Sequence, residues 1–254
     1  MNSLMVDRVS ETQWQAVSGG RTVGHGDVAQ RSDGRLFVSI DVWQDEAFGR
    51  LAAAILADLP APLHALVDEA DPDLRSRWEQ AGFTLARREG EYVLSTDPYE
   101  TGLAAVRAPE GVTVLPGAEA DEELLRALDR AIREEVEAAV GWRTMPAEVL
   151  PCPAGALPLD PARYTVAVRD GVYAGLVRVV PVRRRARIGL VAVRAGHHRR
   201  GIGRALLAHA LGSLHAVGIG SAWAEVDASN TAAIKLLERI GARRAGSNLE
   251  LVRR

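Results

Sequence analysis

The sequence contains a single cysteine, Cys152, so no disulfide can form within the chain. Aromatic residues make up only 5% of it, and no apolar run approaches the ~20 residues that a helix needs to span a bilayer. The 31 Lys and Arg nearly balance the 33 Asp and Glu, so the net charge of −2 gives no reason to bind nucleic acid or anionic membranes. No signal-peptide pattern opens the chain. We therefore expect a cytoplasmic protein without nucleic-acid or membrane partners.

Apolar residues make up 47% of the 254 residues, which is enough for one large core or two smaller ones. After Leu125, apolar residues recur every three or four positions up to Ala139, and Gly141 follows, so this segment is predicted to be a helix. Asp170-Gly171 between two β-rich runs predicts a hairpin. Similar patterns predict further helices at 46–59, 73–81, 201–217 and 230–240, and strands at 36–40, 63–67, 112–115, 164–169, 173–180, 188–193, 222–226 and 248–252. This order indicates a mixed α/β sheet with helices packed on it.

The chain contains a weak internal repeat, in which residues 66–83 resemble residues 225–242. The matching pairs keep a constant separation of 159 residues; they are Val67 and Val226, Asp68 and Asp227, Glu79 and Glu238, and Gly82 and Gly241. Residues 98–111 lack periodicity and contain Pro and Gly. We therefore predict two copies of one module, at 1–97 and 112–254, joined by a linker at 98–111.

The stretch GHHRRGIGRALL, residues 196–207, places arginines and glycines directly before an apolar helix. The first amides of a helix lack backbone partners and carry partial positive charge, so they attract anions. Glycines let a phosphate approach the backbone closely. This loop is predicted to bind a diphosphate.

Two kinds of cofactor could occupy such a loop. A dinucleotide fingerprint would use G-I-G-R-A-L, with Glu225 as the ribose acid, and would make the protein an oxidoreductase. The spacing argues against it, because seven residues separate Val193 at the end of the strand from Gly201, whereas that fingerprint turns tightly.

The second kind of cofactor follows from a resemblance. Residues 188–211, IGLVAVRAGHHRRGIGRALLAHAL, and residues 225–242, EVDASNTAAIKLLERIGA, resemble the signature of the GCN5-related N-acetyltransferases (GNAT), which bind acetyl-CoA. The resemblance covers most of residues 112–254 and implies the mixed GNAT fold. With a degenerate first copy, the tandem arrangement is similar to that of mycothiol synthase-like actinobacterial enzymes.

The resemblance implies roles for particular residues. The backbone of Val191 and Val193 would pair with the pantetheine amides, as in strand addition. Asn230 would bind the pantetheine arm, although Asn at this position also suits a helix N-cap. The residues implied to hold the pyrophosphate through their amides and charge are Arg199, Arg200, Gly201, Ile202, Gly203 and Arg204.

The usual acid–base groups of the family are missing, because Arg187 stands near the position of its acid and Leu237 at that of its tyrosine. Glu225 is the candidate catalytic base, and the alternative for it is a structural ion pair with an arginine. The acids of the helix before Gly141, which are Glu134, Glu135 and Glu137, either form a solvated face or attract a cationic acceptor.

We expect an N-acetyltransferase that moves the acetyl group of acetyl-CoA directly to a primary amine of a small molecule or peptide in a ternary complex. A monomer or homodimer is expected. The main alternative is a non-catalytic acyl-CoA-binding module. No metal site is expected, because His197-His198 lacks further ligands at suitable spacing. The first copy, with Asp41, Asp45 and Glu46 in place of the arginines, is not expected to bind CoA.

Overall fold

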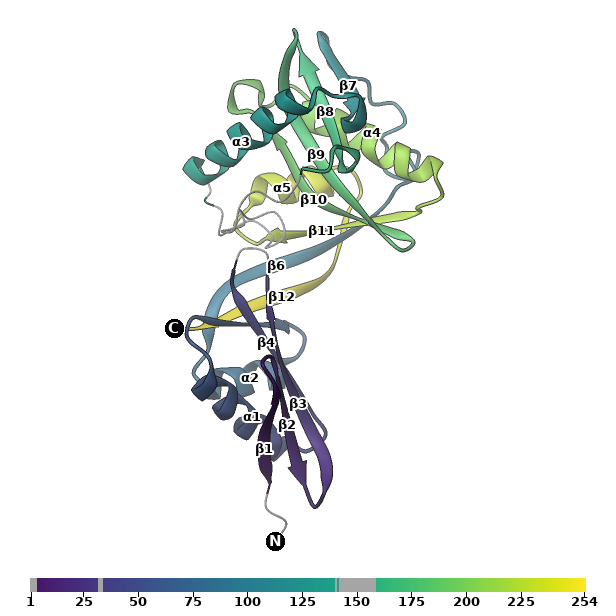
Figure 1. Cartoon of the computed structure of the whole chain (residues 1–254). Coiled ribbons are helices and arrows are strands. Elements are labelled where there is room, and N and C mark those ends of the chain that lie inside the picture. The colour runs from purple at the N-terminus through teal and green to yellow at the C-terminus, as the bar shows by residue number, and fades with distance from the viewer. Residues whose placement is uncertain (1–3, 32–33, 140, 142–158) are drawn as a thin grey trace. The chain divides into compact units, whose positions relative to one another are not determined.

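The computed structural model describes residues 4–31, 34–139, 141 and 159–254. The chain forms two compact units, one made of residues 1–89 and 246–254 and the other of residues 90–245. Each unit consists of a mixed β-sheet with helices packed on it (Figure 1). None of the helices in the described part is both long and apolar enough to cross a bilayer.

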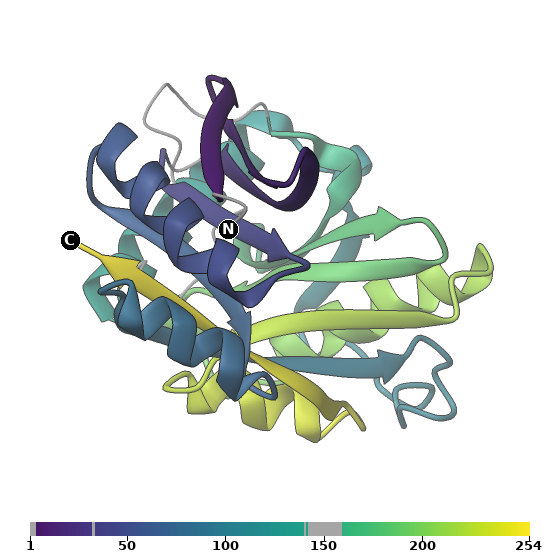
Figure 2. The same cartoon turned by 90° about the horizontal axis from the view of Figure 1, so that it is seen from below.

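The first unit begins with an antiparallel meander and continues with alternating strands and helices. Its elements are β1 Met5–Ser10, β2 Gln13–Ser18, β3 Arg21–Gln30, β4 Leu36–Val42, α1 Asp45–Asp58, β5 Leu63–Asp68, α2 Pro72–Gln80 and the start of β6 Thr84–Ser95. The strands follow the order β1-β2-β3-β4-β5-β12, and only β4 and β5 pair in parallel there. Figure 2 shows the two helices and the strands of this unit from below.

Both helices of the first unit share one apolar core. Phe48 of α1, Trp78 of α2 and Phe83 are all buried in it, together with residues of β4, β5 and β12. The rings of Phe48 and Phe83 each meet Trp78 at a steep angle, with centroids 5.1 and 4.7 Å away. Such aromatic pairs add to the burial energy of this core.

The second unit has helices on both faces of its sheet. Its elements are β7 Val112–Pro116, α3 Glu122–Ala139, β8 Tyr164–Arg169, β9 Val172–Val182, β10 Arg185–Val193, α4 Ile202–Ala216, β11 Ser221–Asp227, α5 Thr231–Glu238 and the start of β12 Arg243–Arg253. Within the described residues, 3-10 turns cover Gly117–Glu119, Pro161–Arg163 and Ala195–His197. The strand order is β6-β11-β10-β9-β8-β7.

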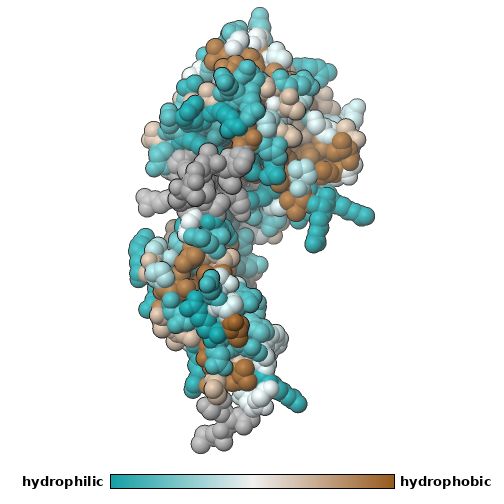
Figure 3. All heavy atoms as spheres, viewed as in Figure 1, coloured by the Kyte–Doolittle hydropathy of each residue, from teal (hydrophilic) through white to brown (hydrophobic). Residues whose placement is uncertain are grey.

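The apolar stripes of the helices decide which face each covers. Leu206 of α4 and Leu237 of α5 are buried in one cluster on the first face. Leu125, Leu128 and Ile132 of α3 form a separate cluster with β8, β9 and β10 on the opposite face. The outward side of α3 is hydrophilic, as the space-filling view shows (Figure 3).

The repeat predicted from the sequence has a matching structure in the two units. Asp71 accepts a hydrogen bond from the Leu74 amide and caps α2, and Asn230, 159 residues later, accepts one from the Ala233 amide and caps α5. The glycines that follow these helices, Gly82 and Gly241, both have positive φ, at 89° and 80°. Equivalent residues therefore make equivalent turns.

The predicted domain boundaries differ from the observed units. Residues 98–111 belong to the second unit, where Leu103 is buried in the core, so they are not a free linker. The last strand, β12, pairs antiparallel with β5, from Asn248 opposite Asp68 to Arg253 opposite Leu63. The end of the chain thus completes the sheet of the first unit, which a division at 112 does not allow.

All predicted helices and strands are present in the structure, but β1, β2, β3 and β6 were missed. The strand pattern of β3 is interrupted by Gly24 and Gly26. A Cβ at Gly26 would lie 2.6 Å from Ile55 Cδ1, so the glycine allows α1 to pack closely against the strand. The same close packing that requires glycine weakens the strand signal in the sequence.

Candidate functional site

The site begins where the parallel strands β10 and β11 separate. They pair only over three positions, from Arg185 opposite Ser221 to Arg187 opposite Trp223. Just beyond this point β10 has a bulge between Ile188 and Leu190, in its pairing with β9. The two strands continue without pairing to their carboxyl ends, so backbone groups of β10 are left available to an added strand.

A cleft of about 360 Å³ opens between the separated strands. Its walls come from α3, β10, the loop after β10, the start of α4, β11 and α5. Five of the residues predicted for the site line it, namely Val191, Val193, Gly203, Glu225 and Asn230. The structure therefore brings together residues from both halves of the predicted motif.

The loop before α4 turns sharply into the helix. Arg199 has φ 59° and Gly201 has φ 81°, both in the left-handed region. Gly201 occupies the N-cap position, and no side chain caps the helix there. The amides of the first turn of α4 are thus available to an anion beside the cleft.

The side chains of the predicted loop residues are placed differently from one another. Ile202 is buried in the core, so only its backbone amide could contact a phosphate. Arg199 and Arg200 are exposed. Arg204 is exposed too, and its guanidinium lies 3.3 Å from the carbonyl oxygen of Gly102. Gly203 lines the cleft, and a Cβ there would lie 3.7 Å from Leu236 Cδ2, which is an ordinary contact.

His198 joins the loop to the end of β10. Its Nε2 lies 2.6 Å from the carbonyl oxygen of Val193, and since a carbonyl only accepts, Nε2 is the donor. This hydrogen bond anchors the imidazole ring to the end of β10. The Val193 carbonyl is consequently occupied, which leaves fewer acceptors on β10 for pantetheine than the sequence suggested.

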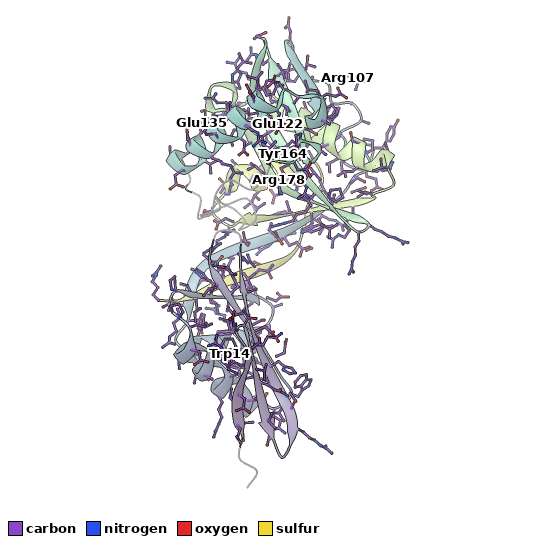
Figure 4. The ribbon with its side chains drawn as sticks, in the orientation of Figure 1. Trp14, Arg107, Glu122, Glu135, Tyr164 and Arg178 are labelled. Carbon is purple, nitrogen blue, oxygen red and sulfur yellow. The ribbon has the colours of Figure 1, made fainter. Side chains whose placement is uncertain are left out.

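Glu135 of α3 binds the same loop through hydrogen bonds from the other side of the cleft. Its carboxylate accepts hydrogen bonds from Arg194 Nε at 2.9 Å and from the Ala195 amide at 2.8 Å (Figure 4). Burial raises the pKa of Glu135, but the Ala195 amide and the Arg194 guanidinium outweigh burial and hold it below the usual value. From the sequence alone, Glu135 was only one of several candidate acids on the predicted helix.

Asn230 combines both roles considered for it. Its Oδ1 accepts from the Ala233 amide at 3.1 Å, which makes it the N-cap of α5, and the residue also lines the cleft. A capping oxygen leaves the amide nitrogen as a donor for a ligand. The cap is observed, and contact with pantetheine stays a prediction.

Glu225 lines the cleft and forms an ion pair with Arg187. The side chain of Arg187 is only 14% exposed and that of Glu225 26%. The alternative of an ion pair with an arginine is therefore realised, and the role of base requires that the pair opens or shares its carboxylate. Leu237, buried and on the wall of the cleft, supplies no proton.

The first unit has large side chains where the second has its cleft. Trp78 occupies the position equivalent to Leu237, at the repeat separation of 159 residues, and is 2% exposed between Phe48 and Phe83. The helix that follows β4 starts with Asp45 and Glu46 and has no glycine in its first turn. These features support the prediction that this copy does not bind CoA.

No group of three metal-ligating side chains occurs among the residues that the structure describes. Cys152, the single cysteine of the chain, lies outside those residues. The cleft chemistry available in the described ranges is therefore that of backbone amides, arginines and carboxylates.

Comparison with known proteins agrees with this geometry. Residues 131–242 match the family model described as the Acetyltransferase (GNAT) family. The second unit carries a GNAT domain. The prediction of an acyltransferase domain is thereby confirmed, whereas the likeness to mycothiol synthase stays a prediction.

A curated relative shares sequence with a short part of this chain. The ribosomal protein bS18-alanine N-acetyltransferase of Escherichia coli K12 is 47% identical over 51 residues, which are 20% of this chain and 34% of that protein. The chain thus matches about a third of that relative's length.

Solved structures resemble nearly the whole chain. A GCN5-related N-acetyltransferase from Sphaerobacter thermophilus has a TM-score of 0.69 and 22% identity, covering 97% of this chain and 81% of that one. A tandem GNAT protein from the clavulanic acid biosynthesis pathway has a TM-score of 0.64 and 17% identity, covering 98% and 83%. These likenesses confirm the predicted mixed α/β GNAT fold, and the tandem arrangement agrees with the second of them.

Proposed function

We propose that the second unit is an N-acetyltransferase that binds acetyl-CoA in the cleft and transfers its acetyl group directly to a primary amine in a ternary complex. The observation that carries this proposal is the separation of β10 and β11 beside the uncapped start of α4. The open strand edge suits the pantetheine amides, and the helix start suits the pyrophosphate. Arg199 and Arg200 add positive charge nearby.

The reaction forms one bond and breaks another. The nitrogen lone pair of the neutral amine attacks the thioester carbon, a C–N bond forms, and the C–S bond breaks as CoA leaves with the electron pair. The nitrogen then loses one proton, which the departing thiolate or solvent takes up, so that a neutral amide remains. A thiol with a pKa near ~8.5 costs only ~2 kcal/mol to release as thiolate at pH 7, so a dedicated acid at Leu237 is dispensable.

Neutralising the amine is the harder step. An alkylamine of pKa ~10.4 costs about 4.6 kcal/mol to deprotonate at pH 7. Glu225 is a carboxylate on the cleft wall, and we propose that it takes this proton as the ion pair with Arg187 loosens. Glu135 is less suited, because it is held by Arg194 and Ala195.

The experiment that tests the proposal is calorimetric titration with acetyl-CoA, with NADH as control, followed by thiol release in a panel of amines. We expect one acetyl-CoA per chain, no NADH binding, and release with some amine. Failure to bind acetyl-CoA would contradict the proposed cleft.

The second candidate is a non-catalytic acyl-CoA-binding module, and the Arg187–Glu225 ion pair is the observation that favours it. Such a module would bind acetyl-CoA in the same cleft but would not transfer the acetyl group. It predicts acetyl-CoA binding without thiol release above background for any amine. The same titration followed by the same release assay separates the two functions.

A further inference from the structure

A row of side chains crosses the sheet of the second unit next to the cleft. Tyr164 of β8 lies opposite Arg178 of β9, and Arg178 lies opposite Leu190 of β10. Residues directly opposite in antiparallel strands point to the same face. Tyr164 and Leu190 both belong to the cluster under α3, so Arg178 lies on that face as well (Figure 4).

Glu225 continues this row on the far side of the cleft. Its neighbours Ala224 and Val226 pack against α4 and α5, so by alternation Glu225 points to the α3 face. Leu190 and Glu225 both line the cleft, where the strands separate. The order across the face is therefore Tyr164, Arg178, Leu190 and then Glu225.

Arg178 has no ion-pair partner among the described residues. It is half-buried, and the ion pairs found in the described ranges do not include it. In the register it lies directly opposite Tyr164, and its charge acts on that hydroxyl. Asp129 is close enough to influence Tyr164, but both oxygens of Asp129 are taken by Arg133, at 2.5 and 3.3 Å.

The local charges make this a positive site. Asp129 and Arg133 cancel, as do Arg187 and Glu225, so Arg178 leaves a net charge of about +1 on a partly desolvated face. Burial first, and the charge of Asp129 second, raise the pKa of Tyr164, so its hydroxyl stays protonated at neutral pH and can donate. A guanidinium and a hydroxyl donor side by side suit a carboxylate or phosphate.

We propose that Arg178 and Tyr164 bind an anionic group of the acceptor, so that the acceptor is an amine that also carries a carboxylate or a phosphate. The inference rests on the proposed acyl transfer, because it takes Glu225 and the separated strands as the place of the amine. Arg178 and Glu225 lie on strands two spacings apart, which is about 10 Å between their backbones. The amine and the anion of the acceptor are therefore joined by a chain of several atoms.

The test compares ligands that differ only in the anion. Calorimetry on the CoA-saturated protein measures 6-aminohexanoate, 5-aminopentyl phosphate and the uncharged 6-aminohexanamide. We expect one of the two anions to bind at least about tenfold more tightly than the carboxamide. Equal binding of all three ligands, or binding of none, would overturn the inference. Because this comparison uses only the wild-type protein, it does not depend on a variant that folds.

Substitutions then test whether Arg178 causes the preference for anionic ligands. Arg178→Gln is expected to remove it, Arg178→Lys to retain part of it, and Tyr164→Phe to reduce it a few-fold. The matched control is Arg126→Gln, whose exposed side chain pairs with Glu122 on α3. The affinity for acetyl-CoA should be unchanged in all four variants, and this unchanged affinity shows that each variant is folded. An intact preference in Arg178→Gln would overturn the inference.

A thiol-release assay distinguishes a failure of the anion site from a failure of the proposed acetyl transfer. If the anions bind through Arg178 but no amine releases thiol, the anion site stands and acetyl transfer fails. If neutral and anionic amines are acetylated equally by the wild type and by Arg178→Gln, transfer stands and the inference fails.

Discussion

Arg187 of β10 donates a hydrogen bond to the carboxylate of Glu225 of β11, at the level where the two strands stop pairing. The pair links the closed part of the sheet to the cleft, because Arg187 still faces Trp223 in register and Glu225 lies beyond it. A carboxylate so placed is at once a structural partner of Arg187 and a candidate base in the cleft. Its two roles respond differently to substitution.

Glu225→Gln is expected to lower kcat/KM for the amine by about 10²–10⁴-fold, which is typical of losing a general base, and to alter the pH–rate profile. Arg187→Gln breaks the same ion pair but keeps the carboxylate, so its activity should exceed that of Glu225→Gln by at least about tenfold. Steady-state kinetics between pH 6 and 9 measure both. An unchanged pH–rate profile in Glu225→Gln would remove Glu225 as the base.

Gly203→Glu is expected to weaken acetyl-CoA binding by about a hundredfold. The new side chain would enter the cleft and place a negative charge at the helix start that is proposed to hold the pyrophosphate. Gly203→Ala is the control, because its Cβ meets only Leu236 and Val193 at 3.7 and 3.8 Å. Alanine should also stabilise α4 by about 0.5–1 kcal/mol. Affinity of Gly203→Glu within twofold of the wild type would contradict the placement.

The sequence predicted the loop and its helix because both signals are local. Gly201 and Gly203 stand directly before a run of apolar residues, and Leu207, Leu211 and Leu214 are buried at helical spacing. The capping role of Asn230 likewise depends on a residue three positions away. Such features need no knowledge of the partner strands.

Contacts that decide the chemistry are not local, and the sequence left them open. Arg187 and Glu225 are 38 residues apart, and Glu135 and Ala195 are 60 apart. Whether such residues meet depends on strand register, and a shift of one residue turns a side chain to the other face. The pairing of β12 with β5 was missed for the same reason, since β6 and β12 have equivalent positions in the repeat.

Glu135→Gln is expected to raise the Kd of acetyl-CoA about three- to tenfold while kcat at saturating donor changes little. The carboxamide has one acceptor oxygen instead of two, so either the Arg194 or the Ala195 contact is lost. The matched control is Glu134→Gln, an exposed neighbour on α3. Equal effects of the two substitutions would contradict a role for Glu135 in holding the loop.

The pH dependence of the Glu135 contacts follows from the direction in which the pKa of Glu135 is shifted. The folded pKa of Glu135 lies below the usual value, so its carboxylate contributes above the unfolded pKa of about 4.5 and the contribution is lost as pH falls through the folded pKa. The difference between the wild type and Glu135→Gln should therefore be constant from pH 6 to 8.

Glu250 tests the stability of the first unit, where it is 5% exposed and lies 2.9 Å from His64 Nδ1, with Arg35 also hydrogen-bonded to it. Burial raises the pKa of Glu250, but the His64 hydrogen bond and the charges of Arg35 and Arg87 outweigh burial and place it below 4.5. The carboxylate therefore stabilises the fold above about pH 4.5, and this stabilisation is lost as pH falls through the folded pKa.

Glu250→Gln leaves buried cations without their anion, so we expect it to lower the free energy of unfolding by about 3 kcal/mol at pH 7. The gap to the wild type should narrow as pH falls below about 4.5 towards the folded pKa, because the unfolded wild-type chain then takes up a proton at Glu250. Urea unfolding at several pH values measures it. Glu79→Gln, which breaks an exposed pair with Arg75, should cost less than about 1 kcal/mol. A gap that stays constant down to pH 3 would show that the charge of Glu250 does not stabilise this core.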